Sequence, residues 1–176
     1  MNKPVATPRS RADIVKLVRY IKKSIQFTGL NFPVCSFVEQ ILPLTDKTFD
    51  YDYVDKSELP KNTYAYYDPI NNIMKIDQDV YLRATEGGVR DRFTIAHEIG
   101  HYFLVDKIAY TRSENEVVPA YMDPEWQANV FASELLIPSD KIRNMSVIEI
   151  TKKCCVSKSA AEIALKNAKK PNYFNQ

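Results

Sequence analysis

Two histidines one helical turn apart, with a glutamate beside the first, are the residues best suited to chemistry. His97, Glu98 and His101 form the pattern H-E-x-x-H. A separation of four residues places both imidazoles on one face of a helix, where they can bind one metal ion, with Glu98 at the rim. Two unrelated histidines would be the alternative, but the apolar residues around them also follow helical spacing. The pattern predicts a zinc site with a general acid/base beside it.

A catalytic zinc ion needs a third protein ligand and an open position. The chain has only 2 histidines, so the third ligand cannot be histidine and the metzincin pattern is excluded. An acidic residue further along the chain is expected instead. The candidates are Asp106, Glu114, Glu116, Asp123 and Glu125.

Glu125 is the best placed of these candidates because it begins a helix with small residues on one face. Those small residues are Ala128, Asn129 and Ala132, and their face can pack closely on the helix that carries Gly100. Asp123 is better explained as the cap of this helix, with Pro124 at its first position. Glu134 is expected to be exposed or ion-paired.

Periodicity and turn residues predict the elements that position these groups. Apolar spacing predicts helices over residues 10–27, 34–42, 89–105, 123–138, 147–154 and 158–169. Pro43 is expected to end the second of them, and Ser157 to cap the last. Aromatic and β-branched runs predict strands over 49–54, 63–67 and 73–77, the last two joined as a hairpin. Residues 106–122 are expected to be loop.

Composition excludes several other classes. With 4 glycines, the chain contains neither a P-loop nor a G-x-G-x-x-G turn. Three cysteines without a C-x-x-C pair favour a reducing, cytoplasmic location over a disulfide framework. No apolar run is long enough to span a membrane. Basic residues are concentrated toward both ends, but they are spread along helices, which favours solvated faces over direct nucleic-acid binding.

Two separate motifs resemble the ImmA/IrrE family of metallopeptidases. They are FTIAHEIGHYFL at residues 93–104 and EWQANVFASELLIP at residues 125–138. The resemblance implies His97, His101 and Glu125 as zinc ligands and Glu98 as the catalytic acid/base. It implies an α+β, zincin-like (minimal gluzincin) fold with a small three-stranded sheet. We expect a peptidase core over residues 1–138 and a helical, helix-turn-helix-like appendage over 139–176.

The same resemblance implies the substrate, a helix-turn-helix repressor of a mobile element or a stress response. The expected reaction is zinc-dependent hydrolysis of a peptide bond, with a non-histidine donor for the oxyanion. A tyrosine, an arginine or a backbone N–H is expected, and the nearest side-chain donors are Tyr102, Tyr110, Tyr121, Arg90 and Arg92.

Two further points stay open at the level of sequence. Residues 73–77 are either a sheet edge on which an extended substrate could pair or an ordinary hairpin strand. The C-terminal helices could make the chain a DNA-binding regulator with a structural metal site, although packing or substrate docking is favoured. A deformylase is disfavoured because the setting of Cys35 does not match its ligand motif.

Overall fold

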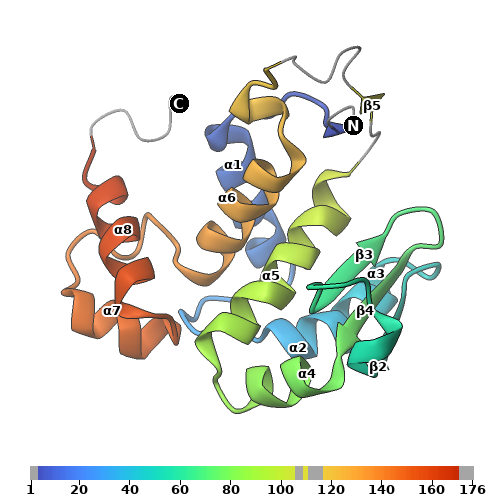
Figure 1. Cartoon of the computed structure of the whole chain (residues 1–176). Coiled ribbons are helices and arrows are strands. Elements are labelled where there is room, and N and C mark those ends of the chain that lie inside the picture. Colours follow the sequence, from blue (N-terminus) through green and yellow to red (C-terminus); the bar gives the residue numbers. More distant parts are fainter. Residues whose placement is uncertain (1–3, 106–108, 111–116, 171–176) are drawn as a thin grey trace.

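The computed structural model describes residues 4–105, 109–110 and 117–170. Helix α5 (Val89–Leu104), which carries the H-E-x-x-H pattern, lies at its centre (Figure 1). A small sheet covers one side of α5, and helix α6 (Pro124–Leu136) packs along another side. Helix α1 (Arg11–Ser24) packs in turn on α6. The two helices expected to carry the metal ligands are therefore neighbours in the middle of the fold.

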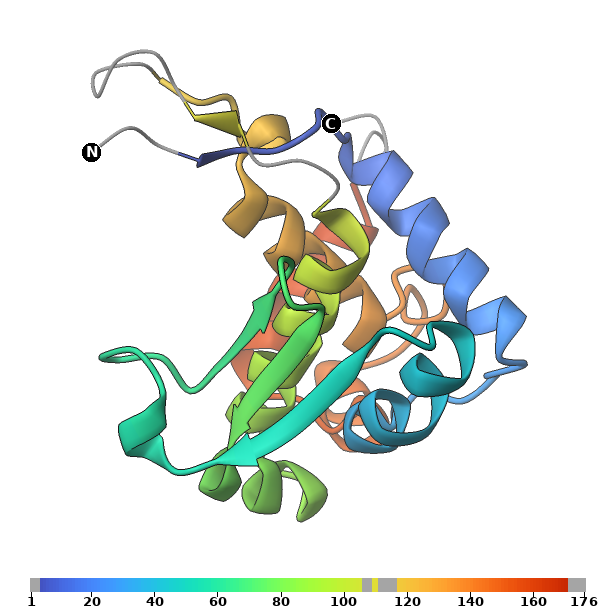
Figure 2. The same cartoon turned by 90° about the vertical axis from the view of Figure 1, so that its right-hand side faces the viewer.

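The sheet is mixed, and its strands lie across α5 (Figure 2). Its strands are β2 (Asp50–Val54), β3 (Ala65–Asp68) and β4 (Ile73–Asp77), in the order β2-β4-β3. Strand β4 runs parallel to β2 and antiparallel to β3, so that Met74 lies opposite both Tyr51 and Tyr67. The predicted α+β class and three-stranded sheet are confirmed, whereas the zincin relationship stays a prediction.

The prediction that residues 73–77 could be a sheet edge is wrong. Strand β4 is the middle strand, and its Met74 and Ile76 are buried. The outer strands are β2 and β3, and of these β3 contacts α5. An extended peptide could therefore add to the sheet beside the H-E-x-x-H helix only along β3.

Helix caps explain why most helices begin where the sequence predicts. Ser10 and Asp13 form a capping box at α1, and the Asp123 side chain accepts from the Glu125 N–H at α6. Ser157 accepts from the Ala160 N–H at the start of α8. Each cap satisfies an N–H that has no partner within its helix. The C-terminal helices are α7 (Val147–Cys154) and α8 (Lys158–Ala168).

Two local predictions were wrong, and one helix was missed. Residues 34–45 stay helical past Pro43, through α2 (Val34–Ser36), a π-helical segment (Phe37–Ile41) and α3 (Leu42–Thr45). Pro43 is tolerated because it lies in the first turn of α3. Helix α4 (Gln78–Thr85), capped by Asp77, was not predicted. Within 106–122, the described residues form strand β5 (Ala109–Tyr110), paired with β1 (Pro4–Val5), and a 3₁₀ turn (Ala120–Met122).

One cluster of buried apolar side chains joins the helices and the sheet. It includes Ile95 and Ile99 of α5, Phe131 of α6 and Met74 of β4, and it continues to Ile150 of α7. The boundary at residue 138 stays a prediction. Among the described residues, no helix has the length and apolarity that crossing a membrane requires.

Glu134 is buried rather than exposed, with 5% of its surface accessible. Its Oε1 accepts hydrogen bonds from the N–H and hydroxyl of Ser139. The Lys22 ammonium donates to the Glu134 main-chain carbonyl at 3.3 Å. Burial raises the pKa of Glu134 to about 7, although the Ser139 hydrogen bonds and the charge of Lys22 oppose the shift. Burial also lowers the pKa of Lys22 to about 8.

Replacing Glu134 should therefore change how stability depends on pH. The folded state favours the protonated carboxyl, so the free energy of unfolding should fall as pH rises from about 4.5 to about 7. In Glu134→Gln this fall, roughly 3 kcal/mol at most, should disappear because the amide keeps an acceptor for Ser139 without a charge. Urea unfolding across this pH range measures it. The exposed Glu162→Gln is the control, and equal slopes in both variants would contradict the prediction.

Candidate metal centre

Helices α5 and α6 bring the three predicted ligands together. The Nε2 atoms of His97 and His101 lie 3.0 Å apart. Glu125 Oε2 lies 3.2 Å from His97 Nε2, and Glu125 Oε1 lies 3.3 Å from His101 Nε2. The structure thus brings together three residues that come from two separate motifs.

The donor set and its spacing fit a zinc ion. Two imidazole nitrogens and a carboxylate oxygen are ligands that zinc takes in hydrolytic sites. Donors about 2.0–2.1 Å from a tetrahedral ion are about 3.3 Å from one another. The two Nε2 atoms are 3.0 Å apart, and one donor atom from each of the three residues lies within 4.8 Å of the others. The Glu125 side chain is 65% exposed, so the cluster faces solvent on one side. The residues could hold a metal ion and leave a position that a substrate could reach.

A close approach of the two helices makes this convergence possible. A Cβ added to Gly100 would lie 3.1 Å from Ala128 Cα and 3.2 Å from the Ala128 carbonyl oxygen. Both contacts are with main-chain atoms, which cannot move aside as a flexible side chain could. Glycine at position 100 therefore allows α6 to approach near enough for Glu125 to meet the histidines.

Asn129 orients one of the histidines. Its Oδ1 lies 3.2 Å from His97 Nδ1, and Asn129 is one turn after Glu125 on α6. An Nδ1–H donated to this oxygen fixes the tautomer that leaves the Nε2 lone pair directed at the cluster. Sequence reasoning treated Asn129 only as a small packing residue. Its position four residues after the predicted ligand Glu125 was the available signal.

Glu98 lies beside the cluster and is more deeply buried than Glu125. It is 8% exposed, and burial raises the pKa of its carboxyl, although the nearby charges of His101 and His97 oppose that shift. The Tyr67 N–H of β3 donates to Glu98 Oε2 at 2.9 Å. One carboxyl oxygen is thus held by the sheet, and the other can exchange a proton. A raised pKa suits a group that both accepts and returns a proton near neutral pH.

A polar network behind Glu98 holds the hairpin against α5. The Tyr67 hydroxyl donates to Asn72 Oδ1, and the Asn72 amide donates to Asp46 Oδ2. Tyr102, next to His101, donates its hydroxyl to the same Asp46 oxygen at 3.1 Å. Hydrogen bonds from Asn72, Thr48 and Tyr102 hold the pKa of Asp46 well below its usual range. Sequence reasoning missed this network because its members are far apart along the chain.

The pKa values of Glu125 and His97 are both shifted by the contacts within the cluster. Hydrogen bonds from His101 and His97 hold the pKa of Glu125 well below its usual range. Burial lowers the pKa of His97, but the hydrogen bond to Glu125 and the charges of Glu98 and Glu125 outweigh it, so the net shift is upward. The cluster carries a negative carboxylate that favours a cation between the two rings.

The other residues considered as ligands or donors lie elsewhere. Asp123 caps α6 as predicted, whereas Asp106, Glu114 and Glu116 and the side chain of Tyr110 lie outside the described residues. Among the proposed oxyanion donors, Tyr102 donates to Asp46, and the buried Arg92 donates to the Phe32 carbonyl. The Arg90 guanidinium lies over the Tyr64 ring, and Tyr121 lies in the 3₁₀ turn before α6. The oxyanion donor stays a prediction.

Two histidines on one helix, a carboxylate from a second and a buried carboxyl beside them define the class of metal-dependent hydrolases of the H-E-x-x-H type. Residues 53–166 match the family model Peptidase_M78, described as the IrrE N-terminal-like domain. The chain belongs to this family, and so is a metallopeptidase of the ImmA/IrrE type. The matched region includes all three residues of the candidate metal site, His97, His101 and Glu125, and continues through α7 into α8. No curated protein matches the chain.

The helix contact can be tested by adding one methyl group. Gly100→Ala should lower the free energy of unfolding by about 1–3 kcal/mol, because the Cβ would meet the Ala128 backbone. It should also weaken zinc binding, because the added methyl group would push α6 away from α5 and so move Glu125 and Asn129 away from the histidines. Isothermal titration with zinc and urea unfolding measure the two effects. Thr94→Ala, on the same helix, is the control, and unchanged zinc affinity in Gly100→Ala would contradict the prediction.

The role of Asn129 can be tested by removing and then restoring its oxygen. Asn129→Ala should reduce zinc affinity by roughly 10–100-fold, because His97 loses the partner that orients it. Asn129→Asp keeps an acceptor at this position and should retain most of the affinity. Zinc titration against a competing chelator measures both. Equal affinity of Asn129→Ala and the unchanged chain would show that this hydrogen bond does not orient His97.

Proposed function

We propose that the chain is a zinc-dependent endopeptidase that hydrolyses a peptide bond in a protein regulator. The observation that carries the proposal is the convergence of His97, His101 and Glu125, whose ligand atoms, one from each residue, lie within 4.8 Å of one another, with the buried Glu98 beside them. His97, His101 and Glu125 would hold the ion, and Glu98 would be the catalytic acid/base.

Each residue of the site has a distinct task in this reaction. A zinc ion at the cluster would make a water more acidic and polarise the scissile carbonyl. Glu98 accepts the proton of the attacking water on one carboxyl oxygen and returns it to the leaving amine. The Tyr67 N–H holds the other oxygen and so limits rotation of the carboxyl. Asn129 keeps the His97 ring in the orientation needed for binding the ion.

The position of β3 supports cleavage within an extended chain. This outer strand lies against α5, and its Tyr67 contacts Glu98. A substrate segment that pairs with β3 would run past the metal cluster in extended form, with its side chains alternating on two faces. Main-chain pairing of this kind suits a polypeptide substrate.

The regulator is proposed to be a helix-turn-helix repressor, and the site of action the cytoplasm. Both follow from the resemblance of residues 93–104 and 125–138 to the ImmA/IrrE motifs, together with a cysteine pattern typical of a reducing compartment. Family membership supports the peptidase activity, and the choice of repressor is the further step that an experiment must decide.

The alternative, a DNA-binding regulator with a structural metal site, requires α8 as a recognition helix. Ala160, Ile163 and Ala164 of α8 instead line a cavity against α6. Lys158 and Glu162 lie 3.9 Å apart as an ion pair on another part of its surface. A salt-dependent shift of duplex DNA by the purified chain would favour this alternative.

Replacing the acid/base tests the proposed reaction. The chain is co-expressed with the helix-turn-helix protein encoded beside its gene, and the partner is followed by immunoblot and mass spectrometry. Glu98→Gln should lower cleavage by roughly 100-fold to 10,000-fold, because the amide cannot accept the proton. Zinc affinity should remain near that of the unchanged chain, since Glu98 is not one of the ligands.

Two controls make this result specific. Glu39→Gln alters a carboxyl that accepts hydrogen bonds from Tyr53 and Tyr81, away from the metal cluster, and should leave cleavage intact. Adding a zinc chelator should stop cleavage by the unchanged chain, and restoring zinc should recover it. An intact partner with the unchanged, zinc-loaded chain would argue against a repressor substrate. Equal cleavage by Glu98→Gln would remove Glu98 from the mechanism.

A further inference from the structure

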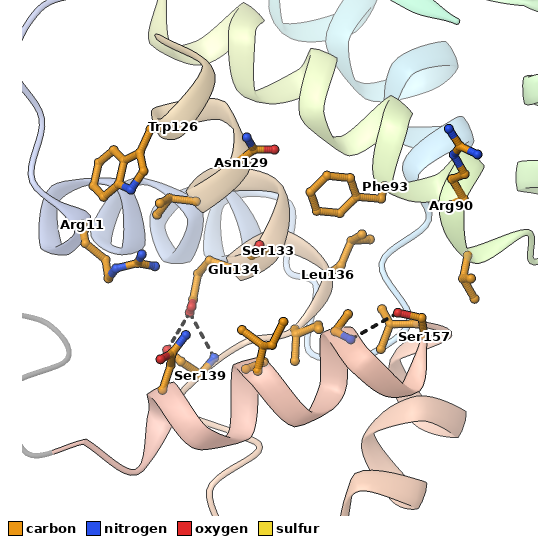
Figure 3. A pocket seen from close by; sticks show the side chains of 18 residues that line it. Arg11, Arg90, Phe93, Trp126, Asn129, Ser133, Glu134, Leu136, Ser139 and Ser157 are labelled. Carbon is orange, nitrogen blue, oxygen red and sulfur yellow. Dashed lines mark hydrogen bonds between the residues drawn. The ribbon is translucent and has the colours of Figure 1, made fainter. Parts of the chain in front are cut away.

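A cavity of about 520 Å³ lies between α6 and α8, next to the metal cluster but outside it (Figure 3). We refer to it as the α6–α8 pocket. Its apolar wall includes Phe93, Trp126, Val130, Ala160, Ile163 and Ala164. Its volume is in the range of about 300–1,000 Å³ that is typical of ligand sites. The catalytic steps described above make no use of this space.

Two residues that line the pocket also lie beside His97 of the cluster. Asn129 lines the pocket and also lies 3.2 Å from His97 Nδ1. Phe93 lines it from α5, one turn before His97, and the two ring centroids are 6.5 Å apart. A chain bound with its scissile bond at the cluster would therefore reach the pocket within a few residues.

Small residues on α8 leave the pocket open. Ala160 and Ala164 face α6 where larger side chains would close the gap, and both are only partly buried. Ile163 and Val89, which also line the pocket, are 62% and 39% exposed. Apolar side chains that line a cavity and stay partly exposed are available to contact a bound molecule.

Two arginines and one glutamate are the charged residues that line the pocket. Figure 3 shows Arg11 and Arg90 at opposite ends of it, and the Arg11 guanidinium lies 5.5 Å from the Trp126 ring centroid. Glu134 is the acidic residue among those that line it, and its carboxyl is already hydrogen-bonded to Ser139. Acidic groups on a bound segment would complement the two arginines.

We infer that the α6–α8 pocket binds a segment of the peptide substrate in which large apolar side chains are flanked by acidic residues. This inference rests on the proposed function, because it identifies the pocket as a specificity site for the same reaction. The apolar side chains would pack between Trp126 and the alanines of α8, and the acidic residues would meet Arg11 and Arg90.

The chain supplies its own probe of the pocket. Trp126 is the only tryptophan in the sequence, so intrinsic fluorescence reports on one pocket residue. We would titrate the zinc-loaded Glu98→Gln chain with two synthetic amphipathic peptides. Both have Leu and Phe at the same positions, and the flanking residues are Glu in one and Lys in the other. Saturable changes in Trp126 emission, with tighter binding of the Glu-flanked peptide, are expected.

Two variants assign any binding to the pocket. Ala164→Phe fills it from α8 and should weaken binding of the Glu-flanked peptide by roughly tenfold or more. Glu162→Phe, on the exposed part of the same helix, is the matched control and should bind normally. Arg90→Glu should reverse the preference between the two peptides. Zinc affinity and circular dichroism should be unchanged in all three variants.

Several results would overturn the inference. One is that neither peptide gives a saturable change in emission. Another is that Ala164→Phe and Glu162→Phe bind the Glu-flanked peptide equally well. A shift in emission that rises with protein concentration alone, together with a dimer mass, would show instead that a second copy fills the pocket.

The outcome also separates this inference from the proposed function. Binding that Ala164→Phe abolishes supports the pocket, even if the unchanged chain cleaves no peptide and the proposed reaction fails. Conversely, cleavage of the Glu-flanked peptide at the same rate by the unchanged chain and by Ala164→Phe would support the peptidase and overturn the pocket.

Discussion

The close contact between Gly100 and the Ala128 backbone is the constraint on which the site depends. The two histidines need only one helix, but the third donor must come from another helix that runs within reach. A single added methyl at Gly100 would meet main-chain atoms 3.1–3.2 Å away. Because the contact involves backbone on the α6 side, a change of rotamer cannot relieve it. The spacing of α5 and α6 therefore fixes both the Glu125 carboxylate and the Asn129 amide relative to His97.

The sheet acts on the site mainly through Glu98. A carboxyl with 8% exposure has lost most of its hydration, and this loss raises its pKa. The hydrogen bond from the Tyr67 N–H replaces part of the lost hydration at one oxygen of Glu98. Tyr67 is in position to donate it because hydrogen bonds through Asn72, Asp46 and Tyr102 hold β3 to α5. The strand that would pair with an extended substrate in the proposed reaction is thus the strand that orients Glu98.

Local signals predicted much of the fold, and long-range contacts account for most of what they missed. Caps such as Ser10 and Asp123 act within one helical turn, so the sequence shows where those helices begin. Strand order does not follow from local pattern: β4 is central because β2 joins it in parallel from residues 50–54. Burial of Glu134 likewise depends on Lys22, more than a hundred residues away, and on Ser139 beyond the helix end. Among the site residues, the H-E-x-x-H spacing reveals His97 and His101, whereas the Tyr67 contact depends on tertiary structure.

The periodicity of α6 connects the metal cluster with the α6–α8 pocket. Glu125 and Asn129 are four residues apart and face α5, whereas Trp126, Val130 and Ser133 follow helical spacing along the pocket. A rigid helix that carries both sets fixes the distance between them. If the pocket binds an apolar part of the substrate, this distance sets how far that part lies from the cleaved bond. Any movement of α6 would then alter peptide selection and metal geometry together, and one helix would couple selection to catalysis.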